Sequence, residues 1–122
     1  MRDRKIRICE HDELAEKQFR IFPIVYKGKP HSGFIYRFND EVHAFLNQCV
    51  HMPRNLNCES PTIFDQDKKY LRCSMHGIVY DPENGQSVST MCNGESLQAL
   101  RLYLSNNTIY INDKHVQQPI ET

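Results

Sequence analysis

Two mixed pairs of cysteine and histidine constrain this chain more than any other feature of its sequence. The first pair is Cys49 and His51. The second is Cys73 and His76, and the twenty-one residues 52–72 separate the two pairs. Each pair lies where an alternating apolar pattern stops and a loop begins, and loops at the end of a rigid sheet commonly carry functional sites. The sequence therefore predicts two loops that supply ligands to one metal centre.

The mixed composition of each pair favours a diiron cluster. Two irons bridged by two sulfides need two protein ligands each. Thiolates on one iron and neutral imidazoles on the other make such a cluster less negative, which raises its reduction potential above that of the all-cysteine type. When each loop contributes one cysteine and one histidine, both loops contact both irons.

Two other interpretations account for the same residues. They could be unrelated buried cysteines and incidental histidines, although two mixed pairs in succession, the second followed by Gly77, fit this poorly. Zinc also binds sets of two cysteines and two histidines, but usually as a C-x-x-C pair followed by a pair of histidines. A structural zinc module therefore stays an alternative to an iron–sulfur centre.

The rest of the chain shows the period-two apolar alternation of short β-strands separated by turn signals. Two runs around Asn39-Asp40, over 34–38 and 42–46, predict a hairpin. The strand count and spacing favour an all-β fold, either a β-sandwich or a small barrel. The residues expected on strands are Ile6, Ile8, Phe22, Ile24, Tyr26, Phe34, Tyr36, Phe38, Val42, Ala44, Leu46, Tyr70, Leu71, Arg72, Leu100, Leu102, Leu104, Ile109 and Ile111.

Three segments are expected to lack strands. Residues 12–17 could form one helical turn. The stretches 47–61 and 74–78 are irregular and contain the two mixed pairs. The tail after Asp113 is polar and is expected to fray.

Composition narrows the partners and the compartment. The 15 basic and 15 acidic residues cancel, and a neutral chain is a poor candidate for binding nucleic acid or an anionic membrane. The longest apolar run, Ile21 to Tyr26, is far shorter than the roughly 18 residues of a membrane span. Five cysteines without a secretory signal are expected to be metal ligands or free thiols, and we expect a cytoplasmic location.

Around the ligands the sequence resembles the Rieske family. Residues 73–81, with the turn that ends at Asn84-Gly85, follow the C-x-x-H-G-x-x-[YF]-D…G pattern of that family. Residues 92–94 with Leu97 resemble the ending of the small soluble bacterial Rieske ferredoxins. The similarity extends from about Phe34 to Ile111.

The resemblance implies an all-β, Rieske-like antiparallel β-sandwich with a small cluster-binding subdomain at one end. Residues 1–122 would form a single Rieske domain, with the subdomain at about 46–88. One [2Fe–2S] cluster per chain is implied as the cofactor. By the same resemblance Cys49 and Cys73 bind the inner iron, and the outer iron is bound near solvent by His51 and His76.

Departures from the family pattern indicate the subtype. The respiratory Rieske proteins have a disulfide between the two loops, but the matching positions here are Arg54 and Met75. Those proteins also have a serine that donates to a bridging sulfide, where this chain has Ile78. Tyr80 keeps the place of a tyrosine that donates to a cysteine sulfur. Fewer donors destabilise the reduced cluster, so we expect a potential in the lower part of the Rieske range.

The resemblance implies a soluble one-electron carrier that passes electrons from a reductase to an oxygenase or reductase partner. The alternative is a fixed Rieske subunit of an oxygenase or nitrite reductase complex. We expect no catalytic residue, because an oxygenase site needs two histidines and a carboxylate on non-haem iron. No two of the remaining histidines have helical spacing; these are His11, His31, His43 and His115.

Several residues near the pattern are expected to have other roles. Cys58 and Cys92 are expected to be small buried side chains or inert thiols. Cys9 is expected to pack on a sheet, and His43 to be structural. Met52, Pro53 and Met75 flank the ligands and could shield the cluster or simply pack within the loops.

Overall fold

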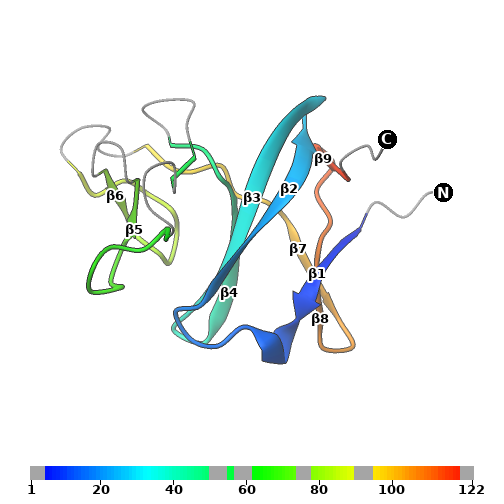
Figure 1. Cartoon of the computed structure of the whole chain (residues 1–122), viewed down its shortest axis with the longest axis horizontal. Coiled ribbons are helices and arrows are strands. Elements are labelled where there is room, and N and C mark those ends of the chain that lie inside the picture. Colours follow the sequence, from blue (N-terminus) through cyan, green and yellow to red (C-terminus); the bar gives the residue numbers. More distant parts are fainter. Residues whose placement is uncertain (1–4, 50–54, 57–61, 74–77, 90–94, 119–122) are drawn as a thin grey trace. The chain divides into compact units, whose positions relative to one another are not determined.

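The computed structural model describes residues 5–49, 55–56, 62–73, 78–89 and 95–118 (Figure 1). In these ranges all regular structure is β, apart from one short 3₁₀ helix, η1, at His11–Glu13. The strands are β1 (Ile6–Glu10), β2 (Phe19–Tyr26), β3 (Lys29–Phe38), β4 (Glu41–Leu46), β5 (Leu71–Arg72), β6 (Val79–Tyr80), β7 (Leu102–Ser105), β8 (Thr108–Ile111) and β9 (Val116–Gln117). All their pairings are antiparallel, so the predicted all-β antiparallel fold is confirmed.

The chain divides into two compact units. The first comprises Met1–Leu46 and Leu100–Thr122, and the second comprises Asn47–Ala99. The first unit holds two sheets, with strand orders β1-β8-β7 and β4-β3-β2-β9. The second unit holds the short β5–β6 hairpin.

The two sheets of the first unit share one hydrophobic core. Ile109 and Ile111 enter it from β8, while Ile24 and Ile35 enter it from β2 and β3, and all four are almost fully buried. A single core with side chains from both sheets is the packing of a β-sandwich. Cys9 lies in this core, as expected for a residue packed on a sheet.

Strand β3 is buried on both faces. Successive residues of a strand point to opposite faces, and Phe34, Ile35 and Tyr36 are each fully buried. Ile35 packs in the sandwich core, so Phe34 and Tyr36 occupy the opposite face. There the two rings stack on each other, and both also contact the ring of Phe45 on β4, with ring centroids 5.9–6.2 Å apart. The alternation expected at 34–38 is present, but its aromatic residues Phe34 and Tyr36 lie on the face of β3 opposite the sandwich core.

The hairpin predicted between 34–38 and 42–46 is present. Phe38 pairs with Glu41 across the two-residue turn Asn39-Asp40. Both turn residues have positive φ, 51° and 65°, which suits the right-handed twist of a hairpin. The carboxylate of Glu16 accepts both of their backbone N–H groups, at 2.7 and 2.9 Å.

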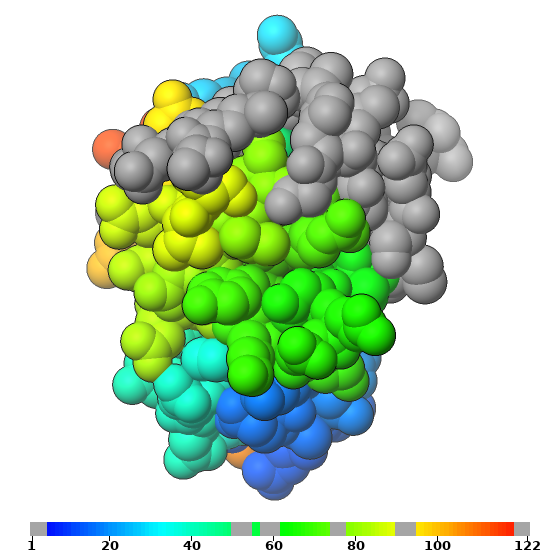
Figure 2. All heavy atoms as spheres, turned by 90° about the vertical axis from the view of Figure 1, so that its left-hand side faces the viewer, coloured from blue at the N-terminus to red at the C-terminus, as the bar shows by residue number. Residues whose placement is uncertain are grey.

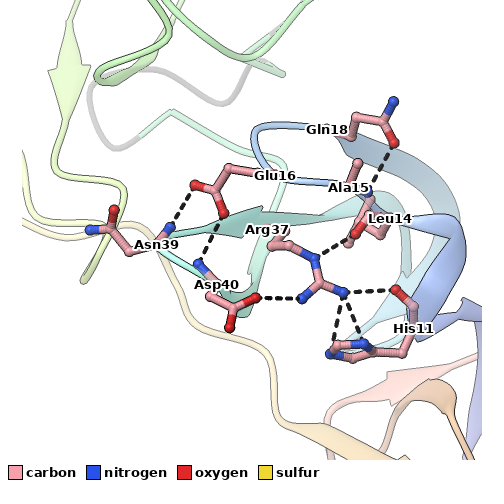
Figure 3. Close-up of polar contacts among 8 residues, drawn as sticks. All are labelled: His11, Leu14, Ala15, Glu16, Gln18, Arg37, Asn39 and Asp40. Atoms are coloured by element: carbon pink, nitrogen blue, oxygen red, sulfur yellow. Dashed lines mark hydrogen bonds and ion pairs between the residues drawn. The ribbon is translucent and has the colours of Figure 1, made fainter.

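Arg37 ties this hairpin to the segment that follows β1 (Figure 3). Its guanidinium donates to the backbone oxygens of His11 and Leu14 and forms an ion pair with Asp40. It also contacts Nδ1 of His11 at 2.9 Å, and because arginine only donates, that nitrogen accepts. A nearly buried charge is retained here because every contact supplies an acceptor.

Two expectations for the first unit were wrong in part. The tail after Asp113 does not simply fray, because Val116 and Gln117 pair with Tyr26 and Val25 as β9. Leu100 was expected on the same strand face as Leu102 and Leu104, but β7 begins only at Leu102, and Leu104 is 54% exposed. Within the described ranges, no helix is both long enough and apolar enough to cross a membrane.

Candidate metal centre

The β5–β6 hairpin positions the second cysteine. Leu71 pairs with Tyr80 and Arg72 pairs with Val79. The backbone N–H of Cys73 then donates to the oxygen of Ile78 at 2.8 Å, which continues the pairing beyond both strands. Cys73 and Ile78 are both buried, so the hairpin holds this cysteine out of contact with water.

Further contacts within the second unit brace this hairpin. On one side Arg72 N–H donates to the oxygen of Ile63 at 2.8 Å. On the other, Val79 N–H donates to Oγ of Ser89, and Val88 N–H donates to the oxygen of Val79. Figure 2 shows the segments around β5 and β6, in green and yellow-green, forming one continuous face.

Tyr80 connects the hairpin to the first cysteine. Its hydroxyl lies 3.2 Å from Sγ of Cys49, and both side chains are buried. Tyr80 pairs with Leu71 on β5, and Cys73 follows Leu71 by two residues. Tyr80 therefore links the first predicted pair to the second. A hydroxyl that donates to a thiolate stabilises the negative charge on sulfur.

The two described cysteines of the predicted set meet the requirements of metal ligands. Cys49 and Cys73 are free thiols and are 2% and 1% exposed. A thiolate must be kept from oxygen and water to hold an iron–sulfur cluster, and this burial does so. The donor set and its surroundings therefore fit the cluster predicted from the sequence.

The histidine half of the predicted set lies outside the described residues, at His51 and His76. Outside the described residues lie also Cys58 and Cys92, and the two positions that depart from the respiratory Rieske pattern, Arg54 and Met75. In the described part of the chain, no group of three or more histidine, cysteine, aspartate or glutamate side chains could hold a metal ion. The four-ligand assignment therefore stays a prediction that is supported by its cysteine half.

The other histidines all belong to the first compact unit and have structural neighbours. His43 stacks on Tyr36, with ring centroids 5.3 Å apart, which supports its interpretation as a structural residue. His31 and His115 both pack edge-on against Tyr26. Burial and the nearby carboxylate of Asp113 raise the pKa of Tyr26.

Cys9 is an inert thiol of the sandwich core. It is almost fully buried, and this burial is the main cause that raises its pKa. A raised pKa keeps the neutral thiol, which neither attacks electrophiles nor binds metals readily. Unlike Cys49, Cys9 also lies outside the two mixed pairs.

Sequence reasoning missed one residue beside the first pair. Asn47 is 1% exposed, and its Oδ1 accepts the backbone N–H of Leu56 at 2.9 Å. The available signal was an asparagine directly after the apolar run 42–46, because asparagine side chains often bond nearby backbone groups where a strand ends.

Comparison with known proteins agrees with this geometry. Residues 4–104 match the model of the Rieske [2Fe-2S] domain family. A comparison with curated proteins found no match.

Solved structures share the fold. The ferredoxin of carbazole 1,9a-dioxygenase from Nocardioides aromaticivorans IC177 is 20% identical, with a TM-score of 0.67, covering 90% of this chain and 98% of that chain. A chain from the complex of reduced oxygenase and oxidized ferredoxin in carbazole 1,9a-dioxygenase is 16% identical, with a TM-score of 0.68, covering 98% and 100%. A 2-oxoquinoline 8-monooxygenase component is 25% identical, with a TM-score of 0.62, covering 93% of this chain but 27% of its own.

The family match extends over most of the chain and includes both mixed pairs. The buried cysteines and the Tyr80 contact fit such a cofactor. The chain therefore belongs to the Rieske [2Fe–2S] domain family, whose cofactor is one [2Fe–2S] cluster per domain.

Proposed function

We propose that this protein is a one-electron carrier whose [2Fe–2S] cluster is held by Cys49, His51, Cys73 and His76. The observation that carries the proposal is the buried contact between Cys49 Sγ and the Tyr80 hydroxyl at 3.2 Å. It places a hydrogen-bond donor on the sulfur of a predicted ligand, from the strand that follows the second pair. Neither zinc nor an incidental cysteine requires that arrangement.

The residues of the second unit perform three tasks in this proposal. Cys49 and Cys73 supply thiolates from side chains that are buried from water. Tyr80 donates to one sulfur and so stabilises added negative charge there. His51 and His76 supply neutral imidazoles, which leave the site less negative than four thiolates would. When bound, the cluster accepts and releases one electron.

Two structural neighbours that match along nearly their whole length support the carrier. The chain covers 98% and 100% of the first two structural neighbours, one named as a ferredoxin and one from an oxygenase–ferredoxin complex. We therefore propose a non-enzymatic electron-transfer component that takes electrons from a reductase and gives them to an oxygenase or reductase.

The domain organisation follows from the same proposal. The chain would be one Rieske domain, with the cluster-binding subdomain in the compact unit Asn47–Ala99. This unit extends further than the 46–88 expected from the sequence and includes the backbone bond from Leu97 N–H to the oxygen of Gly85. The cytoplasmic location stays a prediction.

Iron and sulfide analysis of protein purified without oxygen tests the proposal. We expect two irons and two sulfides per chain, and their loss in Cys49→Ser, His51→Ala, Cys73→Ser and His76→Ala, because a missing ligand opens one iron to water. Zinc in place of iron, or a cluster retained in Cys73→Ser, would refute the assignment.

Matched controls separate ligand loss from general damage. Cys58→Ser and Cys92→Ser are expected to keep the cluster. Cys9→Ser changes an equally buried cysteine of the first unit, so it tests whether any core cysteine substitution causes cluster loss. Gel filtration with candidate partners distinguishes a free carrier from a fixed subunit.

A further inference from the structure

Asn47 joins the two ends of the chain segment that contains the first pair. It directly follows β4, and its Oδ1 accepts the backbone N–H of Leu56 at 2.9 Å. Both residues are essentially inaccessible, at 1% and 0% exposed. The Asn47 side chain thus bonds to a residue nine positions further along the chain, and Cys49 and His51 lie between the two in the sequence.

The bond matters because of where Leu56 lies. It is outside every strand, and its N–H donates to a side chain. A buried N–H without an acceptor costs free energy comparable to a lost hydrogen bond. The fully buried Leu56 side chain and the Asn47 acceptor therefore fix the same point of the segment.

Two hydrogen-bonded contacts hold the chain near Cys49. Two residues upstream, Asn47 is tied to Leu56, and the sulfur itself contacts the hydroxyl of Tyr80 on β6. Only Gln48 separates Asn47 from Cys49, so we expect a displacement of Asn47 to reach the sulfur. The length of the sulfur–hydroxyl contact should therefore depend on the Asn47–Leu56 bond.

We propose that Asn47 is a positioning residue, whose side-chain bond to Leu56 sets the Cys49–Tyr80 hydrogen bond and through it the reduction potential. This inference rests on the proposed function, because it needs a cluster bound at Cys49. It goes beyond that function by assigning a determinant of the potential to a side chain that is not one of the predicted ligands.

A double-mutant cycle on the reduction potential tests the proposal. Asn47→Leu keeps the approximate size of the side chain and removes the acceptor, and Tyr80→Phe removes the hydroxyl. Each single variant should have a lower potential than the wild type. In the double variant the two effects should be less than additive, because the Tyr80 hydroxyl no longer reaches the displaced sulfur in Asn47→Leu.

Two further variants sharpen the test. Asn47→Asp keeps the acceptor, so the effect of Tyr80→Phe should be as large in this background as in the wild type. Asn84→Ala removes another asparagine side chain that accepts a backbone N–H, from Gln86 at 2.8 Å, in an exposed turn of the same compact unit. It should leave the potential unchanged.

Amide hydrogen exchange of Leu56 gives a readout that needs no cluster. The Leu56 N–H should exchange about tenfold faster in Asn47→Leu than in the wild type, and near the wild-type rate in Asn47→Asp. This arm decides the local part of the proposal even if Asn47→Leu does not retain iron.

The outcomes separate this inference from the proposed function. Wild-type protein without iron and sulfide would refute the proposed function. A wild-type cluster together with additive effects in the cycle, or unchanged Leu56 exchange in Asn47→Leu, would refute the positioning role and leave the proposed function intact. Faster Leu56 exchange together with a non-additive cycle supports the positioning role.

Discussion

The hydroxyl of Tyr80 lies 3.2 Å from Sγ of Cys49, and the two side chains come from residues 31 positions apart in the chain. Because Tyr80 pairs with Leu71 across the β5–β6 hairpin, the contact connects the first mixed pair to the strand that leads into the second. The contact is buried, so water does not compete for the sulfur. The predictions about the potential follow from this relationship.

Tyr80→Phe should lower the reduction potential and keep the cluster. The substitution removes the hydroxyl and preserves the ring that fills the site. The extra electron makes sulfur a stronger acceptor, so the reduced state loses more from the change than the oxidised state. A differential loss of about 1 kcal/mol corresponds to about 40 mV for a one-electron couple.

Protein-film voltammetry of the two proteins measures this shift. Tyr103→Phe, an exposed tyrosine of the first unit, serves as the matched control and should not change the potential. An equal or higher potential in Tyr80→Phe would show that the hydroxyl does not donate to the sulfur.

Ile78→Ser should raise the potential. Ile78 is buried two residues after His76 and has no side-chain donor, whereas a serine hydroxyl could donate to a sulfide of the cluster. The same change should lower the free energy of unfolding by about 2–4 kcal/mol, because a buried aliphatic side chain is lost.

Ile78→Ala is the control for that loss of packing. It should destabilise the protein to a similar extent without raising the potential. If Ile78→Ala and Ile78→Ser gave the same potential, the absent donor would not explain the expected low value.

Gly33→Ala should destabilise the first unit through overpacking. A Cβ at this position would lie 2.8 Å from the ring of Phe22 and 2.9 Å from Cδ1 of Leu100, closer than real contacts allow. Forced shifts of this kind cost about 1–3 kcal/mol. Urea unfolding should show a lower midpoint, and adding Phe22→Leu should recover part of the loss. Fully additive effects of the two substitutions would contradict the packing explanation.

Stability should fall at alkaline pH because of Tyr26. Burial, and then Asp113, raise the pKa of Tyr26 above its value in the unfolded chain, which is about 10. The folded state therefore favours the protonated phenol. This contribution is complete below the unfolded pKa and is lost as the pH rises through the folded pKa.

Urea unfolding of wild type and Tyr26→Phe across this range checks the sign. The free energy of unfolding should fall more steeply above about pH 10 in the wild type than in the variant. Parallel curves would mean that the pKa of Tyr26 is the same in the folded and unfolded states.

Local pattern predicted much of the fold where the cause was local. The 34–46 hairpin followed from its alternation and from Asn39-Asp40, whose positive φ the short polar side chains tolerate. The short strand β9 was missed because Val116 and Gln117 pair only with distant residues of β2. The burial of β3 on both faces was missed for the same kind of reason, since alternation identifies one face and packing decides the other.

The candidate site shows the same division. The spacing of the mixed pairs predicted the ligands, because metal coordination demands particular residue types. A contact of Tyr80 with a cysteine sulfur was implied by family resemblance, and in the structure that sulfur belongs to Cys49. The bond from Leu56 to Asn47 was not predicted, since an asparagine at the end of a strand has many possible backbone partners and only the folded chain selects one.

Mössbauer spectroscopy of the oxidised, iron-enriched protein tests the mixed ligand set most directly. Two thiolates on one iron and two imidazoles on the other give the irons different electronic surroundings. The spectrum should therefore contain two quadrupole doublets of equal area, and one-electron reduction should change mainly the doublet of the histidine-bound iron. A single doublet would mean equivalent irons and an all-cysteine cluster, and an absence of iron signal would mean another metal; either result would contradict the assignment of Cys49, His51, Cys73 and His76.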